Sequence, residues 1–149
     1  MSSGTALAVA ITLTSGLAGG IQAAVMGELG ERVGIAPALA FSVLVSALIA
    51  VATLLVWERS VTGLRSAAHQ PAWLWIGGLM SVYIVLAITI ATPRIGVAAT
   101  IGLVIAGNLV MASAIDRWGL LGQDQIPITW HRLLGLALLA VGSALTLRT

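Results

Sequence analysis

The sequence predicts an all-α membrane protein with five transmembrane helices. Of its 149 residues, 59% are hydrophobic and only 8% are charged, whereas an ordinary soluble domain has roughly 25% charged residues. The mean hydropathy of +1.08 agrees with this class. The chain also contains apolar runs of about the 20 residues that an α-helix needs to cross the roughly 30 Å of hydrocarbon in a bilayer.

The five predicted spans are separated by short connectors, so a single transmembrane domain is expected over residues 1–149. The spans cover approximately residues 5–27, 37–57, 73–92, 95–115 and 132–147. Pro37 and Pro71 stand at predicted helix starts, where a missing N–H is harmless, whereas Pro93 and Pro127 are predicted to lie in connectors. All five tryptophans lie near predicted span ends, where an amphipathic ring prefers the headgroup level.

The polar residue types exclude several functions. A net charge of +2 is too small to indicate nucleic-acid binding. The chain has no cysteine, and His69 and His131 lie in polar connectors without carboxylates at ligand spacing, so no metal is expected. The sequence shows no nucleophile with a base and no phosphate-binding glycine loop, so we expect neither enzyme activity nor a cofactor. The first basic residue, Arg32, follows an apolar run too long for a signal peptide, so the first helix is expected to be retained.

Small residues recur at a spacing of four in three predicted spans. Such stripes let helix backbones approach closely in lipid. Two interpretations stay open for each stripe: helix contacts inside one protomer, or a dimer interface. The residues are Ala38, Ser42, Ser46 and Ala50; Ala98, Gly102 and Ala106; and Gly16 with Gly20.

The arginines are distributed almost evenly between the two predicted membrane faces. One face carries Arg59, Arg65, Arg117 and Arg132, and the other carries Arg32, Arg94 and Arg148. Because Lys/Arg asymmetry in short loops sets orientation, this balance predicts insertion in both orientations. Two oppositely inserted copies would form an antiparallel dimer with the inverted-repeat architecture that many transporters carry in one chain. The alternative is that a small bias or a partner protein fixes one orientation.

Three polar side chains stand inside the predicted spans: Gln22, Tyr83 and Asn108. An amide or phenol in hydrocarbon is costly unless it finds a hydrogen-bond partner. Helical phase places all three away from the small-residue faces, which favours a shared substrate-binding cavity. The alternative is that the two amides join helices and Tyr83 simply packs.

The carboxylates lie near the ends of the predicted spans or in connectors. No Asp or Glu falls in the middle of a span, where proton-coupled cation exporters usually carry one. Glu28 follows Gln22 by six residues and is the best candidate for ion coupling. Asp116 is interpreted as a residue that pairs locally with Arg117.

Three ordered motifs are spread along almost the whole chain: GLAGGIQAAVMGELGERVG, WIGGLMSVYIVLAITIATPRIGVAATIGLVIAGNLVMASAIDRWGLLG and HRLLGLALLAVGSALTL. Together they resemble the YdcZ-like five-span family in the drug/metabolite transporter (DMT) superfamily. The sequence departs from the family pattern at Met26, where Asn is usual, and at Asn108, where Gln is usual. The resemblance implies half of a ten-helix transporter, completed by dimerisation, in the inner (plasma) membrane of a bacterium.

We therefore expect a secondary transporter of a small organic solute or metabolite. It would work as an antiparallel dual-topology homodimer, or paired with a paralogue, with Gln22, Tyr83 and Asn108 around a central cavity. Its partners would be the lipid bilayer and the solute. Two alternatives remain: a small dual-topology ion channel, and a non-transporting membrane subunit of a larger complex.

Overall fold

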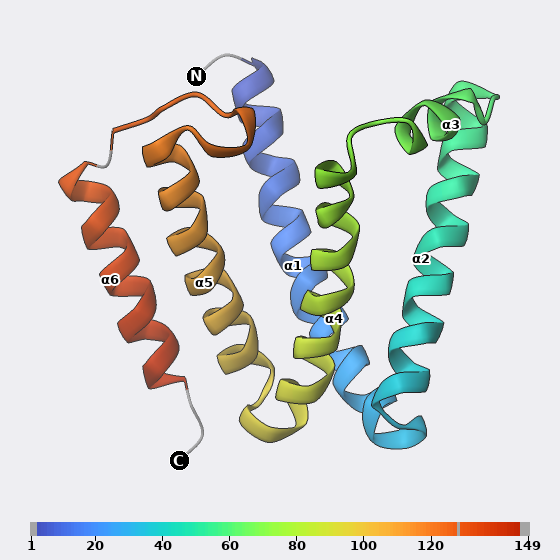
Figure 1. The fold of residues 1–149 in the computed structure, drawn as a ribbon. Helices are drawn as coiled ribbons and strands as arrows, with labels where there is room; N and C mark the ends of the chain where they lie inside the picture. The colour runs from blue at the N-terminus through green and yellow to red at the C-terminus, as the bar shows by residue number, and fades with distance from the viewer. Residues whose placement is uncertain (1–2, 128, 147–149) are drawn as a thin grey trace. The chain divides into compact units, whose positions relative to one another are not determined.

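A computed structural model describes residues 3–127 and 129–146 of the chain. Every element in this part is helical, which confirms the all-α prediction (Figure 1). The last residue of the fifth predicted span, at position 147, and Arg148 lie outside the described residues. The elements are α1 (Ser3–Val33), α2 (Ile35–Glu58), α3 (Thr62–Ala68), the 3-10 helix η1 (Ala72–Trp75), α4 (Ile76–Ile95), α5 (Val97–Trp118), the 3-10 helix η2 (Leu120–Gly122) and α6 (Trp130–Leu145).

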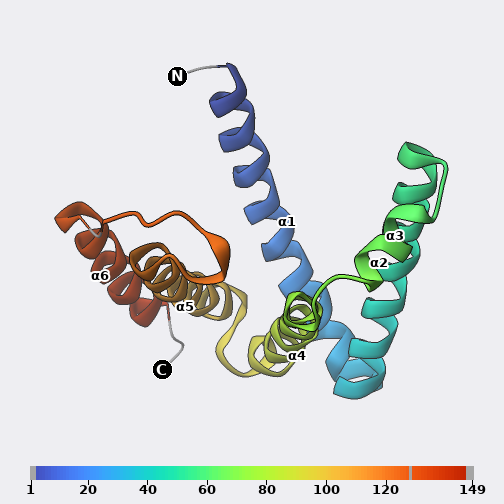
Figure 2. The same ribbon diagram turned by 45° about the horizontal axis from the view of Figure 1, so that its top comes forward.

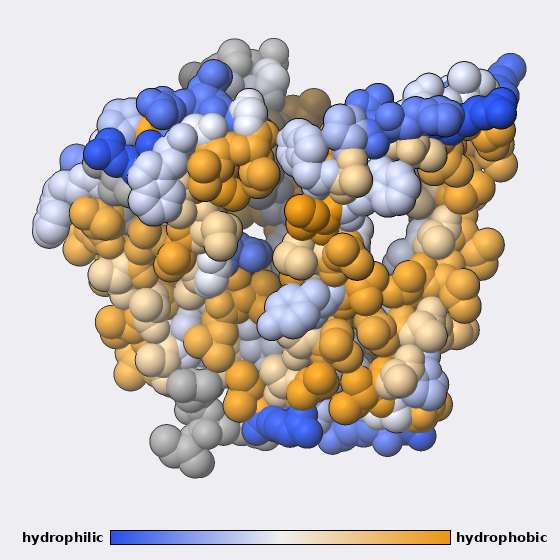
Figure 3. Space-filling model, viewed as in Figure 1, coloured by the Kyte–Doolittle hydropathy of each residue, from blue (hydrophilic) through white to orange (hydrophobic). Residues whose placement is uncertain are grey.

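Four helical segments of the described chain are long and apolar enough to cross a membrane. They are Gly4–Val33, Ile35–Glu58, Ala72–Ile95 and Val97–Trp118. The fifth predicted span corresponds to α6, whose apolar part, Leu133–Leu145, is shorter; its crossing of the membrane therefore stays a prediction. On the face shown in Figure 3, hydrophobic side chains cover most of the helix surfaces, and hydrophilic ones gather near helix ends and connectors.

The ends of the predicted spans need correction at two connectors. Gly34 alone separates α1 from α2, and Gly96 alone separates α4 from α5. The prediction that Pro93 lies in a connector is wrong, because Pro93 lies inside α4. Pro93 is the third residue from the end of α4, and it cannot donate the backbone hydrogen bond of that turn. The helix ends at Gly96 instead, where φ is 86° and ψ is 161°, a conformation that is essentially restricted to glycine.

Each of these glycines ends one helix and begins the next. Gly34 has nearly the same backbone conformation as Gly96, with φ of 91° and ψ of 157°. Both donate their N–H to the carbonyl four residues earlier and accept, on their own carbonyl, the N–H four residues later. The distances are 3.0 Å from Gly34 N to Gly30 O, 3.1 Å from Ala38 N to Gly34 O, 3.0 Å from Gly96 N to Thr92 O and 3.1 Å from Thr100 N to Gly96 O.

The chain divides into two compact units. The first, here the α5–α6 unit, comprises Met1–Ala24 and Ala91–Thr149, and the second, the α2–α4 unit, comprises Val25–Ile90. In the α5–α6 unit, α5 and α6 pack side by side (Figures 1 and 2). A Cβ atom added at Gly102 would lie 2.9 Å from Ser143 Oγ. At Gly102, therefore, the small residue serves a contact inside the protomer.

The α2–α4 unit contains a second close approach of two helices. A Cβ atom added at Gly30, in α1, would lie 2.7 Å from Cγ2 of Thr89, in α4. Thr89 is only 1% exposed, and its hydroxyl donates to the carbonyl of Val85 at 2.7 Å. The absence of a side chain at Gly30 therefore lets α1 approach α4 at this point.

Candidate functional site

The three predicted substrate-binding residues lie on three different helices. Gln22 is in α1, Tyr83 in α4 and Asn108 in α5, and all three side chains are exposed on the protomer. Tyr83 is 64% exposed. Gln22 and Asn108 belong to the α5–α6 unit and Tyr83 belongs to the α2–α4 unit. Their arrangement as one cavity stays a prediction.

The buried residues of each helix show which way the predicted side chains point. The buried residues of α4 include Ile88, Thr89 and Thr92, and at 100° per residue their mean direction is about 180° from Tyr83. In α1, Ala23 and Met26 are buried, and Gln22 stands at the border of that buried face. Tyr83 thus points away from the packed face of α4, and Gln22 lies at the edge of the packed face of α1.

The predicted coupling carboxylate, Glu28, is paired within its own helix. Arg32 Nε donates to Glu28 Oε1 at 2.6 Å, and the two side chains are 72% and 58% exposed respectively. An exposed pair at this spacing contributes only about 0.3–0.5 kcal/mol to stability. The pair lies beyond the predicted first span of residues 5–27, but α1 continues to Val33 and includes it.

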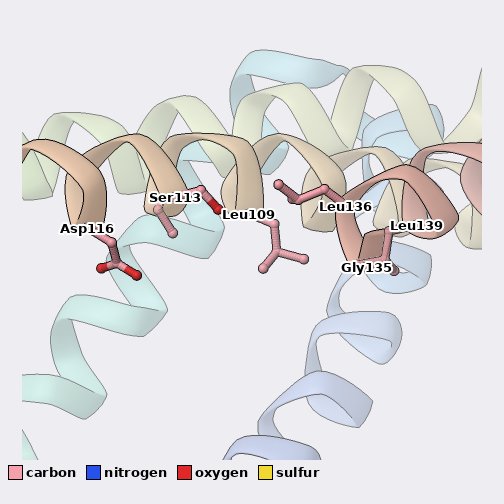
Figure 4. Close-up of a pocket in the computed structure, with 7 residues that line it drawn as sticks. Leu109, Ser113, Asp116, Gly135, Leu136 and Leu139 are labelled. Atoms are coloured by element: carbon pink, nitrogen blue, oxygen red, sulfur yellow. The ribbon is translucent and has the colours of Figure 1, made fainter. Parts of the chain in front are cut away.

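A groove of about 260 Å³ lies between α5 and α6 (Figure 4). Leu109, Ser113 and Asp116 reach it from α5 because residues spaced by four and three share one helix face. On α6, Gly135 contributes no side chain to the wall, and the groove is otherwise mainly apolar. The complete lining is Leu109, Ala112, Ser113, Asp116, Gly135, Leu136 and Leu139.

Asp116 is the residue of this groove that sequence reasoning missed. It is half-buried in the last turn of α5, and its backbone carbonyl accepts the N–H of Ile126 at 2.8 Å. The connector turns back after Gly119, whose φ is 60°, and its η2 segment packs against α5. The spacing from Ser113 was visible in the sequence, but the packing of that face against α6 was not.

Comparison with known proteins identifies the family. A family model described as "Putative inner membrane exporter, YdcZ" matches residues 7–145. The chain belongs to this family. The YdcZ family is a family of DMT-type membrane exporters rather than of enzymes, so this member is a multi-pass transporter of the bacterial inner membrane that acts on a small molecule. No curated protein and no solved structure matches the chain.

Proposed function

We propose that this YdcZ family member is a secondary transporter that exports a small organic solute as an antiparallel dual-topology homodimer. In this proposal a central cavity is lined by Gln22, Tyr83 and Asn108. α6 serves as the fifth span and Glu28 as a possible ion-coupling group. The residues 1–149 then act as one transmembrane domain, and two copies supply the ten helices of a complete transporter.

The exposure of polar side chains on long apolar helices is the observation that carries this proposal. Gln22, Tyr83 and Asn108 are exposed on helices long enough to cross a membrane. An uncompensated amide or hydroxyl in hydrocarbon costs roughly 1–3 kcal/mol by mutational measures. A second copy that encloses these groups around water and solute removes that cost, and it provides the contacts that orient a ligand.

The charge distribution supports the antiparallel form of the dimer. Four arginines on one predicted face oppose three on the other, so the sequence provides almost no orientation signal. Copies inserted in opposite directions then pair about an axis in the membrane plane, as the halves of inverted-repeat transporters do. Rocking of the two copies around the shared cavity would alternate its access between the two sides.

The function is tested by a ligand screen followed by flux measurement. The protein, purified in detergent micelles, is melted in the presence of individual metabolites and organic cations, because a ligand specific for the folded state raises stability by RT ln(1 + [L]/Kd). Each stabilising compound is then assayed for saturable counterflow in proteoliposomes. The expected result is saturable flux whose apparent solute affinity Gln22→Leu lowers about tenfold.

The same measurements separate the alternatives. Ion flux at rates far above the turnover of a carrier would indicate that the protein is a channel. Copurification of a stoichiometric partner protein, with no stabilising compound and no flux, would instead indicate a subunit of a larger complex. In either case the proposed transport function is rejected.

A further inference from the structure

A cavity of about 370 Å³ lies at the start of α5, in the α5–α6 unit. Thr146, which follows the end of α6, closes one side of it, because the end of α6 lies beside the start of α5 (Figure 1). The cavity shares no lining residue with the groove at Asp116, and none of the predicted substrate-binding residues lines it. Its lining residues are Thr92, Ile95, Gly96, Val97, Ala98, Ala99 and Thr146.

The first turn of α5 supplies hydrogen-bond donors to this cavity. The first backbone bond of the helix joins Thr100 N–H to Gly96 O, so the N–H groups of Val97, Ala98 and Ala99 precede the first intrahelical acceptor. Gly96 has no side chain to cap them, and the first turn has no acidic residue. The dipole of the helix adds positive partial charge at the same place.

Thr92 adds a buried hydroxyl to the cavity wall. The residue is 7% exposed, and its Oγ1 is buried without a hydrogen-bond partner. Nearby hydroxyls behave differently: that of Thr89 donates to Val85 O at 2.7 Å and that of Thr100 donates to Gly96 O at 2.8 Å. A turn of roughly 120° about χ1 carries the Thr92 hydroxyl to the position that its methyl group now holds, so the hydroxyl can change its direction without backbone movement.

The junction between α1 and α2 provides a comparison inside the same chain. Residues 32–36 read RVGIA, and residues 94–98 read RIGVA. Gly34 and Gly96, at the centres of these segments, have φ of 91° and 86°. The two helix–glycine–helix junctions therefore share both local sequence and backbone conformation.

The two junctions differ in the donors that they offer. Gly30 holds the position that corresponds to Thr92, so the first junction lacks the hydroxyl. Pro37 holds the position of Ala99, and proline has no N–H. Three amides together with a hydroxyl occur only at the α5 junction of this pair.

We propose that the cavity at the start of α5 binds an oxyanion, a phosphate or carboxylate group, through the N–H groups of Val97, Ala98 and Ala99 and the hydroxyl of Thr92. Backbone amides at a helix N-terminus are suited to this chemistry. The one-residue connector at Gly96 places the cavity at the end of two long apolar helices, so the group can belong to a phospholipid headgroup or to a soluble anion. The proposal is independent of the transport site.

Thermal unfolding of the whole protein in uncharged detergent micelles tests this site. Inorganic phosphate is titrated against chloride at equal ionic strength, and phosphatidylglycerol is compared with phosphatidylcholine in mixed micelles. Stabilisation by phosphate identifies a soluble anion as ligand, and stabilisation by phosphatidylglycerol alone identifies a lipid headgroup. Both results support the site if they depend on Thr92.

Three variants establish that dependence. Thr92→Val keeps the shape but removes the hydroxyl, and it should weaken anion binding about tenfold, because a bond to a charged group is lost. In the absence of anion, the melting temperature of this variant should not fall, because the hydroxyl that it lacks has no hydrogen-bond partner in the wild type. Thr92→Ser should bind as the wild type does. Thr89→Val is the matched control, an equally buried threonine whose hydroxyl is already bonded, and it should leave anion affinity unchanged.

Amide resonances give a second readout that does not depend on how the variants fold. Phosphate or phosphatidylglycerol should shift the N–H signals of Val97, Ala98 and Ala99 in the wild-type protein and leave those of Ile35 and Ala36, at the start of α2, in place. The proposal is overturned if neither anion stabilises the wild type, if Thr92→Val binds as tightly as the wild type, or if the two sets of amides respond equally.

Discussion

Replacing Gly102 by alanine should weaken the packing of α5 against α6. The added Cβ would lie 2.9 Å from Ser143 Oγ and 3.2 Å from Ser143 Cβ. Ser143 is buried and donates to Leu139 O at 2.8 Å, so it has little freedom to withdraw. Overpacking of this kind costs about 1–3 kcal/mol, while alanine restores about 0.5–1 kcal/mol of helix propensity. We expect a net loss of about 1 kcal/mol.

Gly107 is the matched control on the same helix. No atom lies within 4 Å of a Cβ added there, so Gly107→Ala should gain about 0.5–1 kcal/mol from helix propensity alone. The two free energies of unfolding should therefore differ by about 1–3 kcal/mol. Equilibrium unfolding in mixed micelles of increasing SDS content, followed by circular dichroism, measures the difference, and size-exclusion chromatography checks that both variants have the same oligomeric state. Equal changes in the two variants would refute the packing argument.

The remaining predictions concern the transport site and orientation. Glu28→Gln should change the free energy of unfolding by no more than about 0.5 kcal/mol, because its pair with Arg32 is exposed; if Glu28 couples ions, the pH dependence of flux in proteoliposomes should flatten. Gln22→Leu, Asn108→Leu and Tyr83→Phe should each lower solute affinity about tenfold by removing a hydrogen-bonding group, with little change in ligand-free melting; intact affinity in all three would reject the site. A C-terminal reporter should give signals from both sides of the membrane, and two lysines added to one set of connectors should select one orientation; a one-sided signal from the wild type would contradict dual topology.

The helices could be predicted from the sequence because their length is set by a simple physical requirement. An apolar run of about 20 residues is long enough to cross the hydrocarbon core as a helix, whatever other helices lie beside it. The helix ends were less predictable. Pro93 was interpreted as a connector residue, because a proline within a helix removes a hydrogen bond and crowds the preceding turn, yet α4 continues two residues beyond it. At the end of α1, Glu28 and Arg32 suggested a connector, yet they pair along the helix and α1 continues to Val33.

The candidate site could be predicted only in part, because the helices are apolar on nearly every side. In a soluble helix the apolar face identifies the packed side, but in lipid both the packed and the lipid-facing sides are apolar. Gln22, Tyr83 and Asn108 stand out by residue type alone. Asp116 required knowledge of which face of α5 meets α6, and the unpartnered hydroxyl of Thr92 required the position of every neighbouring acceptor. Neither is encoded in local spacing.

The two glycine junctions help to explain why the arginines give only a weak signal for membrane orientation. If each of the four long apolar helices crosses the membrane once, the turns at Gly34 and Gly96 are expected on the same side, because α2 and α4 together return the chain to it. That side would have one-residue turns with Arg32 and Arg94 just before them. The opposite side would carry the long connectors, with Arg59, Arg65 and Arg117 at or between helix ends. One-residue turns leave no room for further basic residues, so the loops that could have encoded orientation lie on one side only and carry few charges. In an antiparallel dimer each membrane surface would display the tight turns of one copy and the long connectors of the other, and the asymmetry within each copy would cancel.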